Sequence, residues 1–247
     1  MRITEHLYQL SGTCYGTNSS TYVLDAGEEL VLFDAGFTPY QLEVMARNRK
    51  RWGLDDKPIT HVFLTHAHMD HAGNAWLFQE KGARILIGRG DEAALAKGGL
   101  VTLDVLFGRP FICCEPDAVI EDGETWRFGD AVVTAVALPG HTAGSMGFLV
   151  QVDEVRAMVT GDFLSLSLAA PDESSQDFLF SAMIRPGFLE EEYGESLRKV
   201  ADMDVDILLP GHLVTYEGNV RKILMAAWHK YQAEPHDIMD LAERSYK

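Results

Sequence analysis

Residues 65–71, with the sequence THAHMDH, constrain the fold of this chain more than any other segment. The apolar run 59–64 before them is typical of a strand buried on both faces. Residues 72–78 after them are typical of the first turns of a helix. The segment is therefore expected on a loop between a strand and a helix, where a rigid scaffold presents functional side chains.

This loop carries four residues of metal-ligand type, namely His66, His68, Asp70 and His71. Two ligands on one face of a helix need a spacing of three or four residues. In an extended or turning loop, His66 and His68 instead point the same way, while Asp70 and His71 diverge toward a second point. The spacing therefore suits two metal ions a few ångströms apart.

Three further residues of metal-ligand type each follow an apolar run and stand beside a glycine. They are His141 after the run 132–138, Asp162 after the run 157–160, and His212 after the run 205–209. Strand ends that lead into glycine-containing loops commonly present functional side chains. We therefore expect these residues to join the same site.

With these motifs the chain resembles the metallo-β-lactamase superfamily, and the resemblance covers nearly its whole length. Five motifs appear in the usual order: Asp34 in FDAG, the 66–71 block, His141, Asp162 and His212. The resemblance implies an α+β fold, a four-layer αβ/βα sandwich in which two mixed sheets pack face to face with helices outside. The metals would lie at one edge, where the sheets meet.

The resemblance also implies a role for each ligand residue. One metal site would consist of His66, His68 and His141. A second would consist of Asp70, His71 and His212, with Asp162 bridging the two. Asp34 would orient the ligands rather than bind metal, as supporting carboxylates do around metal sites in general. The alternative for Asp34 is a carboxylate that caps a turn at a strand end.

The strand and helix pattern fits this layout as a single domain over residues 1–247. It divides into two halves of similar plan, about 1–117 and 118–247, with strand-rich blocks and helices in each. Residues 39–52 are typical of a helix, with Leu42, Met45 and Ala46 expected on its buried face.

Composition favours a compact enzyme of the cytoplasm. The chain has 247 residues, of which 47% are hydrophobic, and a formal net charge of −16. The electrostatic field of so negatively charged a protein repels phosphate backbones, so nucleic acid is not an expected substrate. We see no basic leader and no long apolar run, so neither export nor a membrane is expected. The three cysteines are poorly spaced for disulfides, which favours a reducing cytoplasm.

The ligand types predict the chemistry. Imidazoles and carboxylates without thiolate suit Zn²⁺, Fe²⁺ or Mn²⁺, and the residue types do not choose among them. We expect two divalent ions, with Zn²⁺ named first and Fe²⁺ or Mn²⁺ as alternatives. A pair of divalent ions lowers the pKa of a bridging water from about 15.7 toward about 7, so hydroxide is available at neutral pH. Asp70 can both bind metal and accept a hydrogen bond from the nucleophile, which makes it the predicted catalytic residue. The sequence thus predicts a dinuclear hydrolase that cleaves a small ester, thioester or lactone.

Departures from known branches narrow this prediction. The β-lactamases of the superfamily carry Cys or Ser where this chain has Asp162, so antibiotic hydrolysis is not expected. Asp162 instead resembles its counterparts in glyoxalase II and the lactonases. The acyl-homoserine lactonases place a catalytic Tyr where this chain has Ser165, which counts against that branch.

Two segments are predicted to contact the substrate. Residues 163–193 mix small and apolar side chains and are expected to form a lid, or else a surface loop that packs its own aromatics. The candidate contacts are Ser165 and Arg185 from this segment, and Tyr15 and Asn18 from the opposite loop, which also carries Cys14. For Arg185 the alternative is simple exposure to solvent.

Two other functions stay open. A mononuclear iron dioxygenase resembling the persulfide dioxygenases would share the fold and most motifs, but bind one iron through two His and one Asp. A metal-binding regulatory or scaffold protein would need no turnover, and such a protein need not keep Asp70 or a water-binding bridge. The expected partner is a small-molecule substrate. Dimers are common among such relatives, so a homodimer also stays open.

Overall fold

The computed structural model describes residues 1–166, 178–180 and 188–233. Its first sheet has the strand order β1-β2-β3-β4-β5-β6. The strands are β1 (Leu7–Ser11), β2 (Thr21–Asp25), β3 (Leu30–Phe33), β4 (Ile59–Leu64), β5 (Arg84–Gly88) and β6 (Ala118–Ile120). Strands β1 to β3 are antiparallel, whereas β3 to β6 run parallel to one another.

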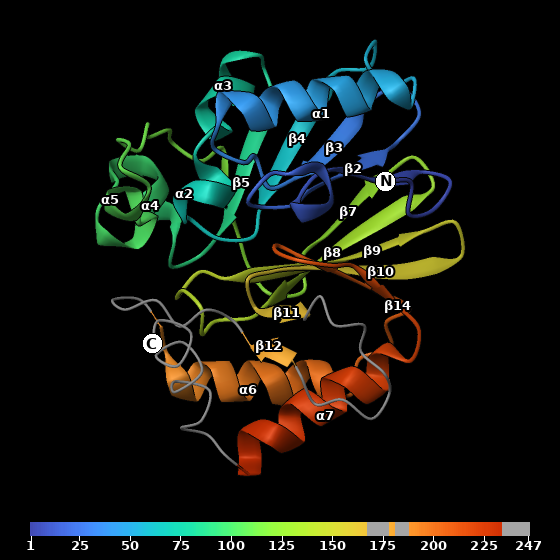
Figure 1. The fold of residues 1–247 in the computed structure, drawn as a ribbon, viewed down its shortest axis with the longest axis vertical. Helices are drawn as coiled ribbons and strands as arrows, with labels where there is room; N and C mark the ends of the chain where they lie inside the picture. Colours follow the sequence, from blue (N-terminus) through green and yellow to red (C-terminus); the bar gives the residue numbers. More distant parts are fainter. Residues whose placement is uncertain (167–177, 181–187, 234–247) are drawn as a thin grey trace.

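The second sheet has the order β14-β13-β10-β9-β8-β7. Its strands are β7 (Thr125–Phe128), β8 (Ala131–Ala137), β9 (Met146–Val152), β10 (Val155–Gly161), β13 (Ile207–Pro210) and β14 (Tyr216–Glu217). Strands β10 and β13 are parallel and the other pairs are antiparallel, so this sheet is also mixed. A small hairpin of β11 (Leu164–Leu166) and β12 (Phe178–Phe180) lies beside it (Figure 1).

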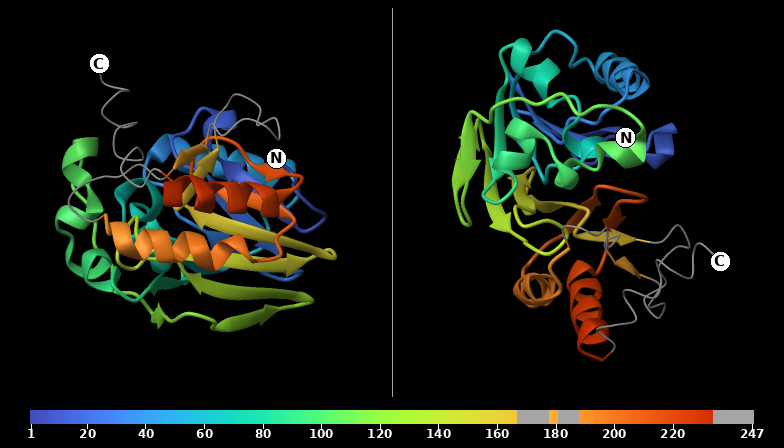
Figure 2. Two further views of the ribbon diagram at one scale, coloured as in Figure 1. Left: turned by 90° about the horizontal axis from the view of Figure 1, so that it is seen from below. Right: turned by 90° about the vertical axis from the view of Figure 1, so that its left-hand side faces the viewer.

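Helices cover the outer faces of both sheets (Figures 1 and 2). The first half contributes the α-helices α1 (Pro39–Arg51), α2 (Met69–Ala72), α3 (Ala75–Glu80), α4 (Glu92–Lys97) and α5 (Asp104–Phe107), with 3-10 turns η1 (Thr13–Tyr15) and η2 (Leu100–Thr102). The second half contributes α6 (Glu190–Ala201) and α7 (Val220–Ala233). The predicted four-layer αβ/βα sandwich is confirmed.

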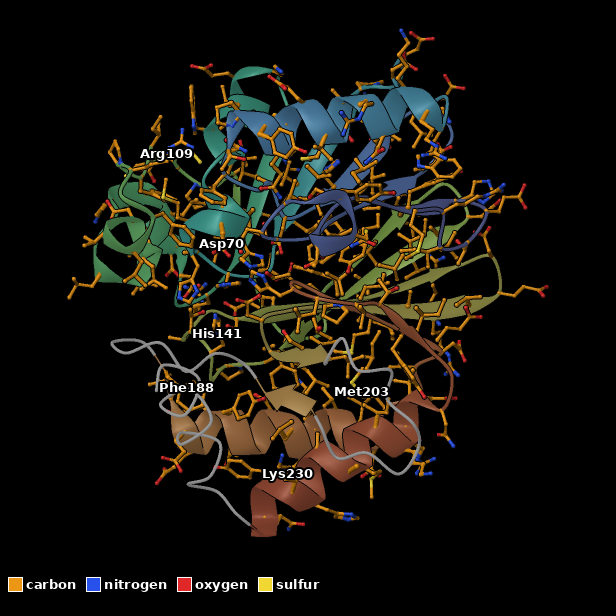
Figure 3. The ribbon with its side chains drawn as sticks, viewed as in Figure 1. Asp70, Arg109, His141, Phe188, Met203 and Lys230 are labelled. Carbon is orange, nitrogen blue, oxygen red and sulfur yellow. The ribbon has the colours of Figure 1, made fainter. Side chains whose placement is uncertain are left out.

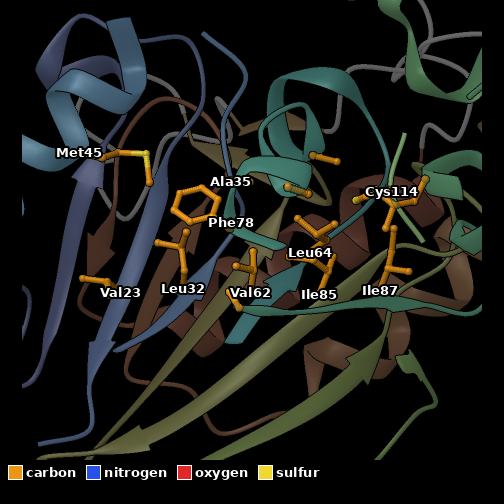
Figure 4. Packing of buried hydrophobic residues seen from close by; sticks show 14 of the residues in the cluster. Val23, Leu32, Ala35, Met45, Val62, Leu64, Phe78, Ile85, Ile87 and Cys114 are labelled. Carbon is orange, nitrogen blue, oxygen red and sulfur yellow. The ribbon is translucent and has the colours of Figure 1, made fainter. Parts of the chain in front are cut away.

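Three hydrophobic clusters hold the layers together. Between the sheets, the ring centroid of Phe63 lies 5.8 Å from that of Phe33 and 5.2 Å from that of Phe148. Burial of one such side chain stabilises the fold by about 1.5–3 kcal/mol. On the outer face of the first sheet, Met45 and Phe78 pack over strand residues (Figure 4). A third cluster joins the second sheet to α6 and α7.

Helix α1 is present as predicted, but its buried face differs from the expected one. Thr38 caps its first turn by accepting a hydrogen bond from the backbone N–H of Gln41 at 3.0 Å. Its buried residues are Gln41, Val44, Met45 and Asn48, whereas Ala46 is exposed. The side-chain amide of Asn48 donates to the carbonyl of Leu10 at 2.7 Å, which is why this polar residue faces the sheet.

The division between the sheets falls slightly later in the chain than the halves proposed from sequence. Strand β6 belongs to the first sheet, so the boundary lies after Ile120 rather than after residue 117. Most of the predicted lid, including Arg185, lies outside the described residues. Within the described part of the chain, we find no helix both long enough and apolar enough to span a membrane.

Candidate metal centre

The predicted ligand residues meet at one edge of the sandwich. They follow the carboxyl ends of β4, β8, β10 and β13, and two of them lie on the short helix α2. Figure 3 shows Asp70 above and His141 below the boundary between the two sheets. Strand ends from both sheets thus supply the site, although its residues are up to 146 positions apart in the chain.

The first group contains His66, His68, His141 and Asp162, whose ligand atoms all lie within 4.8 Å of one another. Nδ1 of His68 is 3.0 Å from Nε2 of His141. Oδ2 of Asp162 is 3.5 Å from Nε2 of His141 and 4.0 Å from Nε2 of His66. All four side chains are buried.

The second group contains Asp70, His71 and His212, again within 4.8 Å of one another. Nε2 of His212 lies 3.2 Å from both Nε2 of His71 and Oδ2 of Asp70. Nε2 of His71 lies 3.6 Å from the same carboxylate oxygen. The side chain of His212 is 25% exposed, so the second group is the more open of the two.

Asp162 reaches both groups. Besides its contacts with the first group, its Oδ1 lies 3.0 Å from Nε2 of His71, and its Oδ2 lies 3.2 Å from Nε2 of His212. Gly211 makes this approach possible, because a Cβ atom there would lie 2.5 Å from Oδ1 of Asp162 and 2.6 Å from the His71 ring. Asp162 therefore lies between the two groups, and its role as a bridging ligand stays a prediction.

Asp34 orients two of the histidines. Its Oδ2 accepts hydrogen bonds from Nδ1 of His71 at 2.8 Å and from Oγ1 of Thr65 at 2.9 Å. Because Thr65 donates to Asp34, its oxygen is left to accept from Nδ1 of His66, 3.0 Å away. His66 therefore carries its proton on Nδ1, and both rings direct Nε2 into the site, where a metal ion would bind.

The loop before β2 supports the second group from the other side. The backbone carbonyl of Asn18 accepts from Nδ1 of His212 at 3.1 Å, which leaves Nε2 of that ring free to bind metal. The side-chain amide of Asn18 donates to Oδ2 of Asp70 at 2.9 Å. Ser19 donates its hydroxyl to the backbone carbonyl of Asp70 at 2.5 Å. The sequence predicted Asn18 only as a substrate contact, which stays a prediction, and gave no supporting role to Ser19 or Thr65, which are common residue types with no motif of their own.

The electrostatics of the two groups differ. Burial lowers the pKa of His68 to about 3 and also holds the pKa of His66 well below its usual value, which favours the neutral form that a metal ligand needs. Burial also opposes charge on His212, but the carboxylates of Asp162 and Asp70 outweigh it and raise its pKa to about 10. The same carboxylates raise the pKa of His71 despite its burial. This attraction for positive charge also favours a divalent cation.

The donor set fits bound metal ions. Nε2 of His66 and Oδ1 of Asp162 are buried and have no hydrogen-bond partner within the described residues. Such orphaned polar atoms are costly unless a ligand satisfies them. The Nε2 atoms of His71 and His212, both freed by bonds at Nδ1, also face one another. The seven predicted residues are thus brought together, and their role as metal ligands stays a prediction.

The other candidate substrate contacts are more scattered. Ser165 is buried in β11. The hydroxyl of Tyr15 is bonded to the amino group of Met1. The thiol of Cys14 contacts Oε1 of Gln9 at 3.6 Å, and burial raises the pKa of that thiol. Within the described residues, none of these three side chains has a hydrogen bond or ion pair with the two ligand groups. The substrate roles of Ser165 and Tyr15 remain predictions, and no role was predicted for Cys14.

Relatives of known sequence point to one family. Residues 14–212 match the family model of the metallo-beta-lactamase superfamily. The chain is 29% identical to an atrochrysone carboxyl ACP thioesterase of Aspergillus fumigatus over 92% of its own length and 60% of that protein. It is also 29% identical to the uncharacterized protein YobT of Bacillus subtilis, over 86% of this chain and 91% of YobT. A hydroxyacylglutathione hydrolase of Rhizobium etli is 34% identical over 50% of this chain and 36% of that protein.

Solved structures agree on the fold. The subclass B3 metallo-beta-lactamase BJP-1 of Bradyrhizobium japonicum superposes with a TM-score of 0.70 at 18% identity, covering 100% of this chain and 94% of that one. A metallo-beta-lactamase family protein of Thermus thermophilus gives 0.71 at 19% identity, covering 97% and 83%. At such identities the likeness concerns the fold alone. Together with the family match over residues 14–212, it shows that this chain belongs to the metallo-beta-lactamase superfamily.

Proposed function

We propose that this chain is a metal-dependent hydrolase of a small ester, thioester or lactone, and that it uses two divalent metal ions, with Zn²⁺ the first choice. Relatives named as a thioesterase and as hydroxyacylglutathione hydrolases support hydrolysis. One observation supports the proposal that two metal ions are bound. Asp162 lies within 4.0 Å of ligand atoms from both histidine groups, as a bridging ligand would.

The residues that would hold the metals follow from the two groups. His66, His68 and His141 would hold one ion, Asp70, His71 and His212 the other, and Asp162 would touch both. When bound, such ions polarise a carbonyl and lower the pKa of water to near 7. The acidic chain, with its net charge of −16, disfavours nucleic acid as substrate.

The protein residues then have defined tasks. Asp34 and the carbonyl of Asn18 hold His71 and His212 in the tautomer with a free Nε2. Asp70 would accept a proton from the attacking water, because its carboxylate faces the site and is oriented by the amide of Asn18. Burial of the first group keeps bulk water away from the reacting bond. A thioester suits this site because acyl transfer to water needs no further nucleophile from the protein.

The test is a panel of ester, thioester and lactone substrates with matched variants. His68→Ala and Asp162→Ala should abolish hydrolysis, whereas His229→Ala and Asp202→Ala, which remove the same residue types from exposed positions, should not. Retention of hydrolysis in His68→Ala or Asp162→Ala would refute the mechanism. No turnover of any panel member by the metal-loaded protein would favour a scaffold role instead.

A second candidate rests on the composition of the second group. Asp70, His71 and His212 form a set of two imidazoles and one carboxylate, which is the set that non-haem iron oxygenases use. A mononuclear iron dioxygenase would therefore consume oxygen with a persulfide substrate. We rank it below the hydrolase, because four further ligand-type residues stand beside this set.

A further inference from the structure

A second buried carboxylate lies close to the metal centre and belongs to neither ligand group. Asp91 follows β5 and is only 1% exposed. Its Oδ2 accepts hydrogen bonds from the backbone N–H of Ala67 and from Oγ1 of Thr142, both at 2.8 Å. Its Oδ1 accepts from the backbone N–H of Gly144 at 2.9 Å. Burial raises the pKa of Asp91, and these donors act against that shift by favouring the carboxylate.

The three donors stand in the two loops that present the first ligand group. Ala67 lies between His66 and His68, and Thr142 directly follows His141. The first loop leaves β4 of one sheet, and the second connects β8 and β9 of the other. Asp91 therefore fastens the two sheets together beside the ligands that they share.

Residues 88–91 and the loop that carries His141 approach so closely that glycine is required on both sides. A Cβ atom on Gly144 would lie 2.4 Å from the backbone nitrogen of Asp91. A Cβ atom on Gly90 would lie 2.8 Å from the carbonyl carbon of Ala143, and one on Gly88 would lie 2.3 Å from the carbonyl oxygen of Gly144. Backbone thus packs directly on backbone, which leaves little slack between Asp91 and the loop that carries His141.

The loop that carries Thr142 is also braced internally. Oγ of Ser145 accepts from the backbone N–H of Thr142 at 2.9 Å and lies 2.8 Å from its Oγ1. A shift of Asp91 would therefore move the whole turn that carries His141, rather than one side chain. Loss of its carboxylate would also leave two buried backbone N–H groups, those of Ala67 and Gly144, without their acceptor.

We propose that Asp91 is a positioning residue that sets the separation of the loops carrying His66, His68 and His141, and thereby the metal affinity of this group. The inference rests on the metal sites proposed above. It adds a second support beside Asp34, which contacts His71 directly and reaches His66 through Thr65. Asp34, after β3, orients His71, whereas Asp91, after β5, aligns the two loops of the first group, with β4 between them.

The experiment compares Asp91→Asn with Asp117→Asn. Asp117 is an exposed control of the same residue type at the opposite end of β5, where it also accepts from a backbone N–H, that of Ile85 at 2.8 Å, and from Gln79 at 3.0 Å. Zn²⁺ affinities are measured by competition with a chelator, and Co²⁺ absorption spectra report ligand geometry. Asp91→Asn should weaken one of two metals by about 10–100-fold and alter the Co²⁺ spectrum. Asp117→Asn should match the wild type in both.

Thr142 provides an independent pair of variants in case Asp91→Asn does not fold. Thr142→Val removes one donor to Asp91 and should weaken the same metal several-fold, while Thr142→Ser keeps the hydroxyl and should restore the affinity. Wild-type affinities and spectrum in folded Asp91→Asn, or in Thr142→Val, would overturn the inference and leave the proposed function intact. If the wild-type chain bound no divalent metal, both this inference and the proposed function would be wrong.

Discussion

Nδ1 of His71 donates a hydrogen bond to Oδ2 of Asp34 across 2.8 Å, inside a fully buried environment. This contact fixes the proton on the nitrogen that faces away from the site, and leaves Nε2 for a metal ion. Asp34 also accepts from the backbone N–H of Thr65 at 2.7 Å, so it ties the start of the ligand loop to one of its ligands.

Asp34→Asn should break this arrangement without disturbing the backbone. Asp34 has φ 60, a conformation that Asn adopts readily. The amide group would face the Nδ1–H of His71 with a donor, so the proton would shift to Nε2 and the lone pair would be lost. We expect metal affinity or hydrolysis to fall by about 10–100-fold, measured by chelator competition and kinetics.

Asp25→Asn is the control for that change. Asp25 lies at the far end of β2, where it accepts from Lys57 at 2.5 Å and from the backbone N–H of Gly27 at 3.1 Å. Its replacement should leave metal affinity unchanged. Equal effects of the two substitutions would mean that Asp34 merely caps a turn.

Asn18→Ala should reduce the rate of reaction without removing metal. Its amide orients Asp70 at 2.9 Å, whereas His212 is held by the backbone carbonyl, which the substitution keeps. A hydrogen bond to a charged group contributes about 1.5–3 kcal/mol, so kcat should fall by about 10- to 150-fold with unchanged metal content. Asn18→Asp should be worse, because it places a second negative charge beside Asp70. Wild-type kcat in both variants would show that the Asn18 amide does not orient Asp70 for catalysis.

The contact between His6 and Asp153, which lies away from the metal centre, should make the free energy of unfolding depend on pH. Nδ1 of His6 lies 2.5 Å from Oδ1 of Asp153. The hydrogen bond to Asp153 raises the pKa of His6 above 6.5. Burial alone would raise the pKa of Asp153, but hydrogen bonds from Thr4 and His6 lower it below 3.8.

The sign of each shift defines the window. The His6 contribution is complete below pH 6.5 and is lost as pH rises through its raised pKa. The Asp153 contribution is complete above pH 3.8 and is lost as pH falls through its lowered pKa. His6→Gln should therefore destabilise the protein most near pH 5.5 and least near pH 9, by no more than about 1 kcal/mol at this half-exposed site. Urea unfolding at the two pH values measures it, and a pH-independent difference would contradict the pairing.

Much of this molecule could be predicted from its sequence because metal ligands impose strict residue types. His66, His141 and His212 stand at strand ends in recognisable contexts, and the structure brings them together. The strand and helix pattern fitted the layered sandwich that the resemblance implied. The role of Asp34 was predicted only by resemblance, and the contact with His71 now gives it a physical basis.

Other features depend on contacts that no local pattern encodes. Asp91 stands before a short helix and has the sequence context of an ordinary cap, while its partners lie 24 to 53 residues away. Helix α1 buries the polar residues Gln41 and Asn48 because both bond to the first sheet or its loops. A hydrophobic pattern assigns such residues to solvent, and so it placed Ala46 on the wrong face.

The proposed hydrolase depends on two metal ions joined through Asp162. Elemental analysis of protein purified without chelators measures them most directly. We predict close to two divalent metal ions per wild-type chain, and at most one per chain in Asp162→Ala. A single iron per wild-type chain, with no further metal bound on addition of Zn²⁺ or Mn²⁺, would contradict the dinuclear hydrolase and favour the dioxygenase.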